Sequence, residues 1–221
     1  MQPYNKRLIW LFISSLIYII SINTSIGYII FSPIQLLITY THEFGHAFMC
    51  LISGGHVESL QISLDGSGET STVGGSYKLI IMGGYIGSCI FSNILMLFSL
   101  NNFKAKIASF CLGISTFYAS IFWYHDYATS LYLCILGIAF LIISKLKIKS
   151  FILQFISIAS LIAIILDFNV GPTSDLEQFE KELPIFSYTM WMYIWLLIVL
   201  VITIWNVKTI IKSTKPSKIN V

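Results

Sequence analysis

Apolar residues fill seven long stretches of this chain, which short polar segments separate. The stretches lie at Leu8–Ile22, Pro33–Ser53, Tyr77–Leu100, Ala105–Trp123, Tyr127–Ser144, Phe151–Leu166 and Ser187–Val207. Most approach the roughly 20 apolar residues that a helix needs to cross the hydrocarbon core of a bilayer. The pattern predicts an all-α polytopic membrane protein with about six or seven transmembrane helices. We expect a single domain over residues 1–221, with a polar loop at about 167–186 and a basic tail at 208–221.

The second apolar stretch has clear start and stop signals. Ser32-Pro33 is typical of an N-cap followed by proline at the first helical position, and Gly54-Gly55 is typical of a helix end. These signals predict a helix over Pro33–Ser53. Its length of about 31 Å would match the thickness of the hydrocarbon core.

A pair of glycines, Gly83 and Gly87, lies in the third apolar stretch. Their small-x-x-x-small spacing places both on one face of a helix, where a neighbouring helix can approach closely. We expect this face to pack against the second apolar stretch.

The hydrophobic period changes from helical to alternating at about residues 55–76. Three alternating apolar residues are followed by a turn sequence and a possible return strand: Leu60, Ile62 and Leu64, then Asp65-Gly66-Ser67-Gly68, then Thr70–Val73. This order predicts a short β-hairpin. Its edge could bind an extended peptide, or the hairpin could be an ordinary connection between helices, and the sequence leaves both open.

Composition and charge narrow the class of protein. Of the 221 residues, 56% are hydrophobic and only 10% are charged, and the mean hydropathy is +0.82, as in multi-pass membrane proteins. The net charge of +3 is small and no basic run interleaves with aromatic residues, which argues against nucleic-acid binding. The four cysteines lie in apolar stretches without a Cys-x-x-Cys pair, so we expect packing roles rather than disulfides or a thiolate metal site.

A cluster of ionisable residues, Thr41-His42-Glu43-Phe44-Gly45-His46, lies inside the second apolar stretch. On a helix, the His-Glu-x-x-His spacing places two imidazoles on one face, where they can bind one Zn²⁺. Ionisable groups within a membrane-length segment are costly and indicate a functional site. We therefore predict a zinc site with His42 and His46 as ligands and Glu43 as the catalytic base that activates a zinc-bound water.

A catalytic zinc usually takes three protein ligands, so a third ligand is expected. With seven spans, every acidic residue other than Glu43 lies on one side of the membrane, and nine lysines lie on the other. The candidates on the acidic side are His56, Asp65, His125, Asp126, Asp167 and Asp175. The hairpin turn explains Asp65, and a capping box at Ser174–Glu177 offers a second explanation for Asp175. Spacing alone does not choose among Asp126, Asp167 and Asp175.

From the histidine cluster onward, the chain resembles the site-2 protease-type intramembrane zinc metallopeptidases, and in particular their small branch without a PDZ domain. The resemblance rests on His-Glu-Phe-Gly-His-Ala-Phe and on five further segments: Gly54–Ser59, Asp65-Gly66-x-Gly68, Gly84-Tyr85-x-Gly87-Ser88, Ser174-Asp175 before Pro184, and Trp191 with Trp195 in the last stretch. The resemblance implies a zinc ion held by the two histidines and an aspartate, with the glutamate as general base.

The resemblance also orders the candidates for the third ligand. In better-known members of the family, the aspartate belongs to a Leu-Asp-Gly motif at the start of a later membrane helix, and the later stretches of this chain lack that motif. Ser174-Asp175 similarly opens a helical stretch, which makes Asp175 the first choice, with Asp167 second and Asp126 third.

The predicted function is that of an intramembrane zinc metalloendopeptidase, which hydrolyses peptide bonds in or near membrane-embedded segments. Its partners would be a membrane protein or peptide substrate and the lipid bilayer, and its location a cell membrane. The alternative is a non-catalytic membrane protein that uses the same fold for metal binding or as a scaffold. The positive-inside rule places the acidic side outside the cytoplasm, whereas analogy with better-known relatives places it inside, and both orientations remain open.

Overall fold

The computed structural model describes residues 3–166 and 174–213. These residues form helices and one two-stranded sheet, which confirms the prediction of a helical protein with a short hairpin. In chain order the elements are α1 (Pro3–Ile22), α2 (Ser25–Ile52), β1 (His56–Ile62), β2 (Gly68–Val73), α3 (Tyr77–Met82), the π-helix η1 (Gly83–Gly87), α4 (Ser88–Ser99), α5 (Asn102–Phe122), α6 (Tyr127–Ile143), α7 (Lys149–Leu166), α8 (Asp175–Glu182) and α9 (Tyr188–Ser213).

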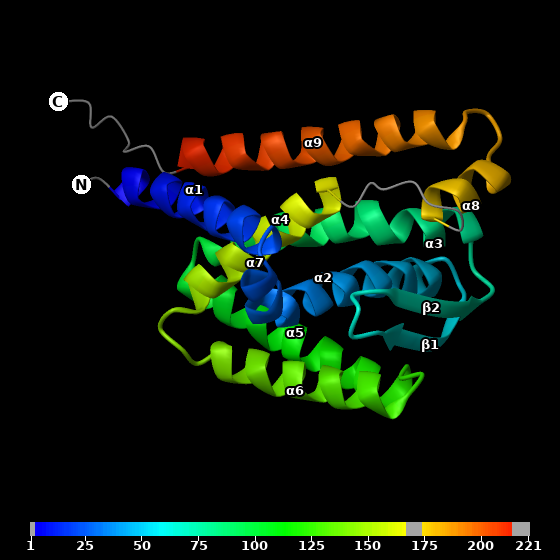
Figure 1. The fold of residues 1–221 in the computed structure, drawn as a ribbon, viewed down its shortest axis with the longest axis horizontal. Coiled ribbons are helices and arrows are strands. Elements are labelled where there is room, and N and C mark those ends of the chain that lie inside the picture. Colours follow the sequence, from blue (N-terminus) through cyan, green and yellow to red (C-terminus); the bar gives the residue numbers. More distant parts are fainter. Residues whose placement is uncertain (1–2, 167–173, 214–221) are drawn as a thin grey trace.

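The longer helices run roughly along the long axis of the molecule (Figure 1). Helix α1 ends near the middle of the molecule, where α2 begins, so these two helices in series lead from one end to the other. Helices α3, η1 and α4 form one continuous run in the opposite direction. The start of α1 and the end of α9 lie at the same end of the molecule, opposite the hairpin and α8 (Figure 1).

Among the described residues, four helical stretches are long and apolar enough to cross a membrane: Tyr77–Ser99, Asn102–Phe122, Lys149–Leu166 and Tyr188–Lys212. Two shorter apolar helical segments are Phe12–Ile22 of α1 and Tyr127–Ile143. These lengths and compositions support an integral membrane protein, while the count of six or seven spans stays a prediction.

The start of α2 differs from the prediction. The helix begins at Ser25, capped by the Thr24 hydroxyl, which accepts a hydrogen bond from the Gly27 N–H, and Pro33 lies inside it. A proline removes the donor that its turn would supply to the carbonyl four residues earlier. Here the Ser32 hydroxyl donates to that carbonyl, on Ile29, at 2.9 Å, so the helix continues through the proline. The predicted helix start at Ser32-Pro33 is therefore wrong. The predicted helix end before Gly54 is confirmed.

The predicted hairpin forms, and its two edges differ. Strands β1 and β2 pair antiparallel, with an irregularity between Val57 and Ser59. The outer edge of β1 is covered: Leu60 exchanges main-chain hydrogen bonds with the Trp123–His125 segment, and the Ile62 N–H donates to the Thr129 hydroxyl. Within the described residues, β2 pairs only with β1. The sheet therefore has one fixed edge and one edge without a strand partner.

Close glycine packing joins α2 to η1, as the small-x-x-x-small pattern predicts. A Cβ atom built on Gly45 would lie 2.1 Å from the carbonyl oxygen of Gly83, and one built on Gly83 would lie 2.4 Å from the carbonyl oxygen of Gly45. One apolar core packs mainly around α2, β1, α5 and α6, and a second around η1, α4, α7, α8 and α9. The contact between Gly45 and Gly83 brings the backbones of α2 and η1 close together.

Gly83→Ala should destabilise the protein by about 1–3 kcal/mol, because backbone atoms must move to admit the new methyl group. Gly87→Ala is the matched control: its Cβ would meet the Gly45 Cα at an ordinary 3.6 Å, so little change is expected. Thermal unfolding of both variants in detergent micelles would compare them. Equal melting temperatures would show that the glycine contact does not limit the approach of the helices.

Candidate metal centre

Three metal-ligating side chains converge near the hairpin end of the molecule: His42 and His46 from α2, and Asp175 from the first turn of α8. The Asp175 Oδ2 atom lies 3.2 Å from His42 Nε2 and 3.3 Å from His46 Nε2. One ligand atom from each residue falls within 4.8 Å of the other two. In the part of the chain that the structure describes, no other group of three histidine, cysteine or acidic side chains converges in this way.

The separation of these atoms fits a single zinc ion. Two ligands of a tetrahedral zinc, each about 2.0–2.2 Å from the ion, lie roughly 3.3–3.5 Å apart. The distances of 3.2 and 3.3 Å are close to this spacing. Two imidazoles and a carboxylate are also a donor set that catalytic zinc uses, with a fourth position left for water.

The local sequence of α8 accounts for the position of Asp175. The Ser174 hydroxyl caps the helix by accepting a hydrogen bond from the Glu177 N–H, which leaves Asp175 in the first turn. Leu176 and Phe179 are buried against helix α9, where the Phe179 ring packs on Trp191 and Trp195. The capping role of Ser174 and a ligand role for Asp175 are therefore compatible, because the first side chain of the capped helix reaches the histidines.

The charge state of Asp175 suits a side chain that binds a metal cation. Burial raises the pKa of this carboxyl, but hydrogen bonds from His42 and His46 and the positive charge of these imidazoles outweigh it. The pKa therefore lies below its ordinary value, so the side chain is an ionised carboxylate at neutral pH.

The other proposed third ligands lie elsewhere. Asp126 caps α6, where it accepts hydrogen bonds of 2.8 Å from both the N–H and the hydroxyl of Thr129. Asp65 accepts bonds from the hydroxyl and N–H of Ser67 in the hairpin turn, as the turn interpretation predicts. These hydrogen bonds lower the pKa of each carboxyl. Asp167 lies outside the described residues.

The main chain of α3 orients one of the two histidines. His46 Nδ1 lies 2.7 Å from the Ile80 carbonyl oxygen, which can only accept a hydrogen bond. Nδ1 therefore carries a proton and donates to this carbonyl. Nε2, which faces Asp175, would have to give up its own proton to ligate a metal, and the ring would then be held as many ligating histidines are. Sequence reasoning missed this contact because a main-chain carbonyl carries no residue-specific signal.

Gly84 provides space beside the two imidazoles. A Cβ at this position would lie 2.5 Å from His42 Nε2 and 2.6 Å from His46 Nε2, on the atoms that face Asp175. The adjacent residues Gly83 and Gly84 thus have separate roles, Gly83 in helix packing and Gly84 at the site. Both belong to the π-helix η1, a distortion that is common at functional sites.

Glu43 lies beside this group rather than within it. Glu43 is only 6% exposed, and its Oε2 atom accepts a hydrogen bond of 2.7 Å from the Thr70 hydroxyl of β2. A cavity of about 590 Å³ is lined by Glu43, the three ligand candidates and residues of β2. A second cavity, of about 570 Å³ between α1, α2, α7 and the hairpin turn, also reaches His42 and Glu43.

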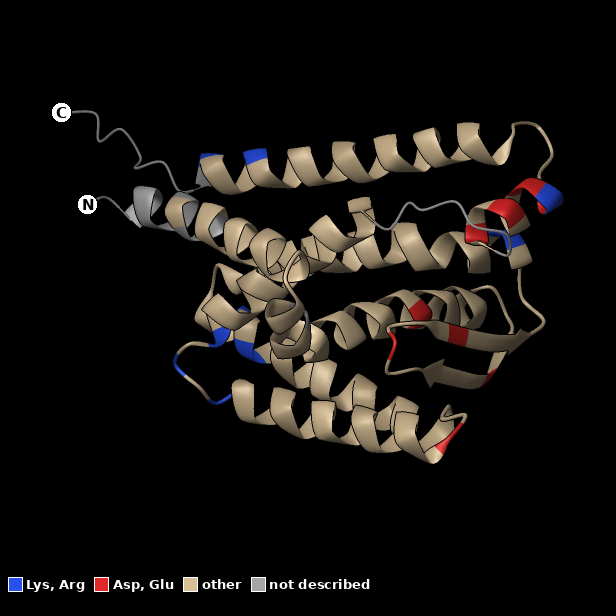
Figure 2. Ribbon diagram, in the orientation of Figure 1, with Lys and Arg blue, Asp and Glu red and all other residues tan. Residues whose placement is uncertain are grey.

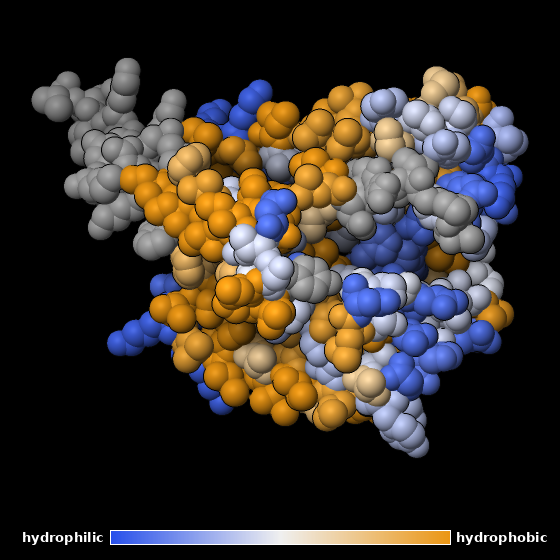
Figure 3. Space-filling view, viewed as in Figure 1, coloured by the Kyte–Doolittle hydropathy of each residue, from blue (hydrophilic) through white to orange (hydrophobic). Residues whose placement is uncertain are grey.

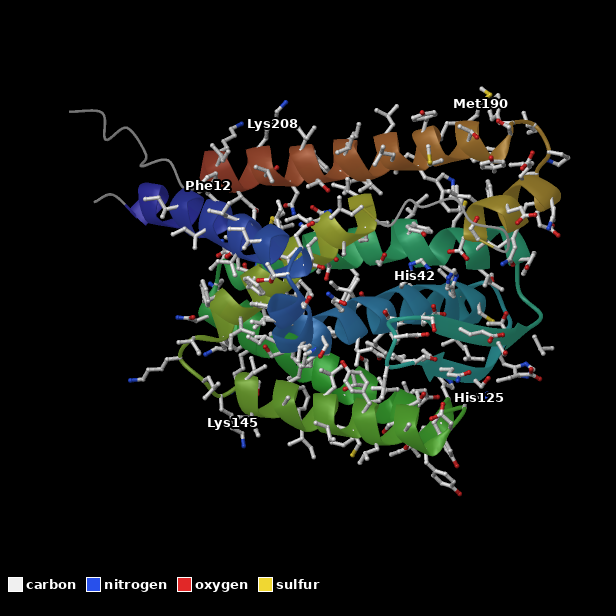
Figure 4. All side chains as sticks on the ribbon, in the orientation of Figure 1. Phe12, His42, His125, Lys145, Met190 and Lys208 are labelled. Carbon is white, nitrogen blue, oxygen red and sulfur yellow. The ribbon has the colours of Figure 1, made fainter. Side chains whose placement is uncertain are left out.

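The site lies at the polar end of the molecule. Acidic residues gather at the hairpin, the α5–α6 connection and α8, whereas most lysines lie at the opposite end (Figure 2). Hydrophilic side chains surround a hollow between the hairpin and α8, and hydrophobic side chains cover most of the rest of this face (Figure 3). His42 lies near this hollow, while Lys145 and Lys208 lie at the far end (Figure 4).

Comparison with known proteins identifies the family. No curated protein and no solved structure matches the chain significantly. The family model described as Peptidase M50B-like matches residues 12–206, which include both histidines, Glu43 and Asp175. The resemblance to site-2 proteases is thereby confirmed over most of the chain. The chain therefore belongs to the Peptidase M50B-like family, within the site-2 protease group.

Proposed function

We propose that this protein is an intramembrane zinc metalloendopeptidase, which hydrolyses peptide bonds in or near membrane-embedded segments. The observation that carries the proposal is the convergence of His42, His46 and Asp175 beside Glu43, in a chain of a membrane metallopeptidase family. The spacing of the ligand atoms and the main-chain contact that orients His46 support zinc as the metal.

In this proposal each residue has a separate role. His42, His46 and Asp175 hold the zinc ion, which when bound polarises the scissile carbonyl and acidifies a water molecule. Glu43 accepts the proton of the attacking water and passes it to the nitrogen of the leaving amine. Its place next to His42 in the sequence, outside the ligand group, suits a base that contacts the water.

The cavity beside the site is suited to an extended peptide. A helical substrate hides its backbone, so the segment to be cleaved must unwind. Strand β2 lines the cavity through Gly68, Glu69, Thr70 and Thr72, and within the described residues one edge of this strand has no strand partner. A peptide could pair with that edge through main-chain hydrogen bonds. We therefore expect the substrate to be a membrane protein or peptide that is partly unwound at the cleavage point.

Glu43→Gln should leave zinc bound but reduce cleavage of a co-expressed membrane substrate by at least about 100-fold, because the amide cannot accept the proton. The exposed carboxylate Glu58 on β1 offers the matched control, since Glu58→Gln removes an equal charge away from the site. Immunoblotting of the tagged substrate would give the cleaved fraction. Wild-type cleavage by Glu43→Gln would refute the catalytic role and favour a scaffold.

Purified protein should contain about one zinc per chain, and His42→Ala and Asp175→Ala should each lose most of it, because two ligands bind zinc weakly. Asp126→Ala removes a helix cap, at a cost of about 1 kcal/mol in stability, and should keep its zinc. Elemental analysis would measure the metal content. Equal zinc in Asp175→Ala and wild type would exclude Asp175 as the third ligand, and no zinc in wild type would favour the scaffold alternative.

A further inference from the structure

Strand β2 contacts the Glu43 side chain at two positions. The Thr70 hydroxyl donates to Glu43 Oε2 at 2.7 Å. Two residues earlier, a Cβ on Gly68 would lie 2.7 Å from both Cγ and Oε1 of Glu43. Residues two apart in a strand face the same side of the sheet, so Gly68 and Thr70 together form the surface against which this carboxylate lies.

We propose that Thr70 is a positioning residue for Glu43, an inference that rests on the function proposed above. The terminal torsion of a glutamate side chain is broad and weakly restricted. A hydroxyl bound to Oε2 fixes the plane of the carboxylate and leaves Oε1 free for a water molecule. Thr70 suits this task because its β-branched side chain has restricted rotamers, so the strand sets the direction of its hydroxyl.

The hairpin has other attachments to α2, which separate a positioning role from a purely structural one. One turn before Glu43, the Thr39 hydroxyl donates to the Gly66 carbonyl oxygen at 2.7 Å. Strand β1 is held by buried Leu60 and by its main-chain bonds to the α5–α6 connection. The Thr70 hydroxyl also lies 3.1 Å from the main-chain carbonyl oxygen of Glu43, a longer contact than the 2.7 Å to Oε2. Because the other attachments remain, loss of the hydroxyl should leave the hairpin in place and release the carboxylate.

Three variants of β2 test the proposal. Thr70→Val keeps the shape but removes the hydroxyl, Thr70→Ser keeps the hydroxyl, and Ser71→Ala changes a neighbour that points to the opposite face of the strand. Each would be reconstituted in phosphatidylcholine vesicles with a tagged reporter that carries one apolar segment, and kcat, KM and zinc content would be measured. Glu43→Gln serves as the benchmark for loss of the base.

We expect Thr70→Val to lower kcat by about 10- to 100-fold, the rate equivalent of a hydrogen bond to a charged group, with KM and zinc content nearly unchanged. Thr70→Ser should recover most of the rate, and Ser71→Ala should match the wild type. A wild-type kcat in Thr70→Val, or equal loss of rate or zinc in Thr70→Val and Thr70→Ser, would overturn the proposal. If Glu43→Gln itself cleaves normally, the proposed function fails instead.

Discussion

Four ionisable side chains, His42, Glu43, His46 and Asp175, lie together among apolar helices, and the cost of removing them from water constrains the fold around them. Three elements beside this cluster each supply a compensating contact. Helix α3 offers the Ile80 carbonyl to His46, strand β2 offers the Thr70 hydroxyl to Glu43, and α8 brings the Asp175 carboxylate to both imidazoles. Helix α3, strand β2 and helix α8 thus supply the polar contacts that the cluster requires, and a bound cation would complete the compensation.

The π-helix η1 reconciles two demands on the same side of α2. Close helix packing needs backbone against backbone, which Gly83 and Gly45 provide. The site needs open space next to the imidazoles, which Gly84 provides one residue later. In a regular α-helix, adjacent residues point about 100° apart, so both could not face α2 equally well. The wider turn of a π-helix brings adjacent positions closer to one face, which explains why the distortion falls at this point in the chain.

Local patterns predicted much of this protein, and contacts distant in the sequence account for what they missed. The His-Glu-x-x-His spacing, the alternating hairpin and the cap at Ser174 each depend on a few neighbouring residues. Spacing alone did not single out Asp175, because it is 133 positions from His42 and its approach to the histidines depends on contacts such as the packing of Phe179 against the tryptophans of α9. The wrong start of α2 had a local cause: Ser32 was interpreted as an N-cap, but its hydroxyl donates to the Ile29 carbonyl instead, and the helix continues through Pro33.

Strand β2 can serve the base and the substrate at once, because the two tasks use perpendicular directions. Side chains project above and below a sheet, so Thr70 reaches Glu43 from one face of the strand. Main-chain donors and acceptors project within the plane of the sheet, toward the edge without a strand partner. A peptide bound to that edge would therefore leave the Thr70 hydroxyl in contact with Glu43. Because the outer edge of β1 is fixed to the α5–α6 connection, the register of β2 is fixed as well, and a paired peptide would be held in a defined position relative to Glu43.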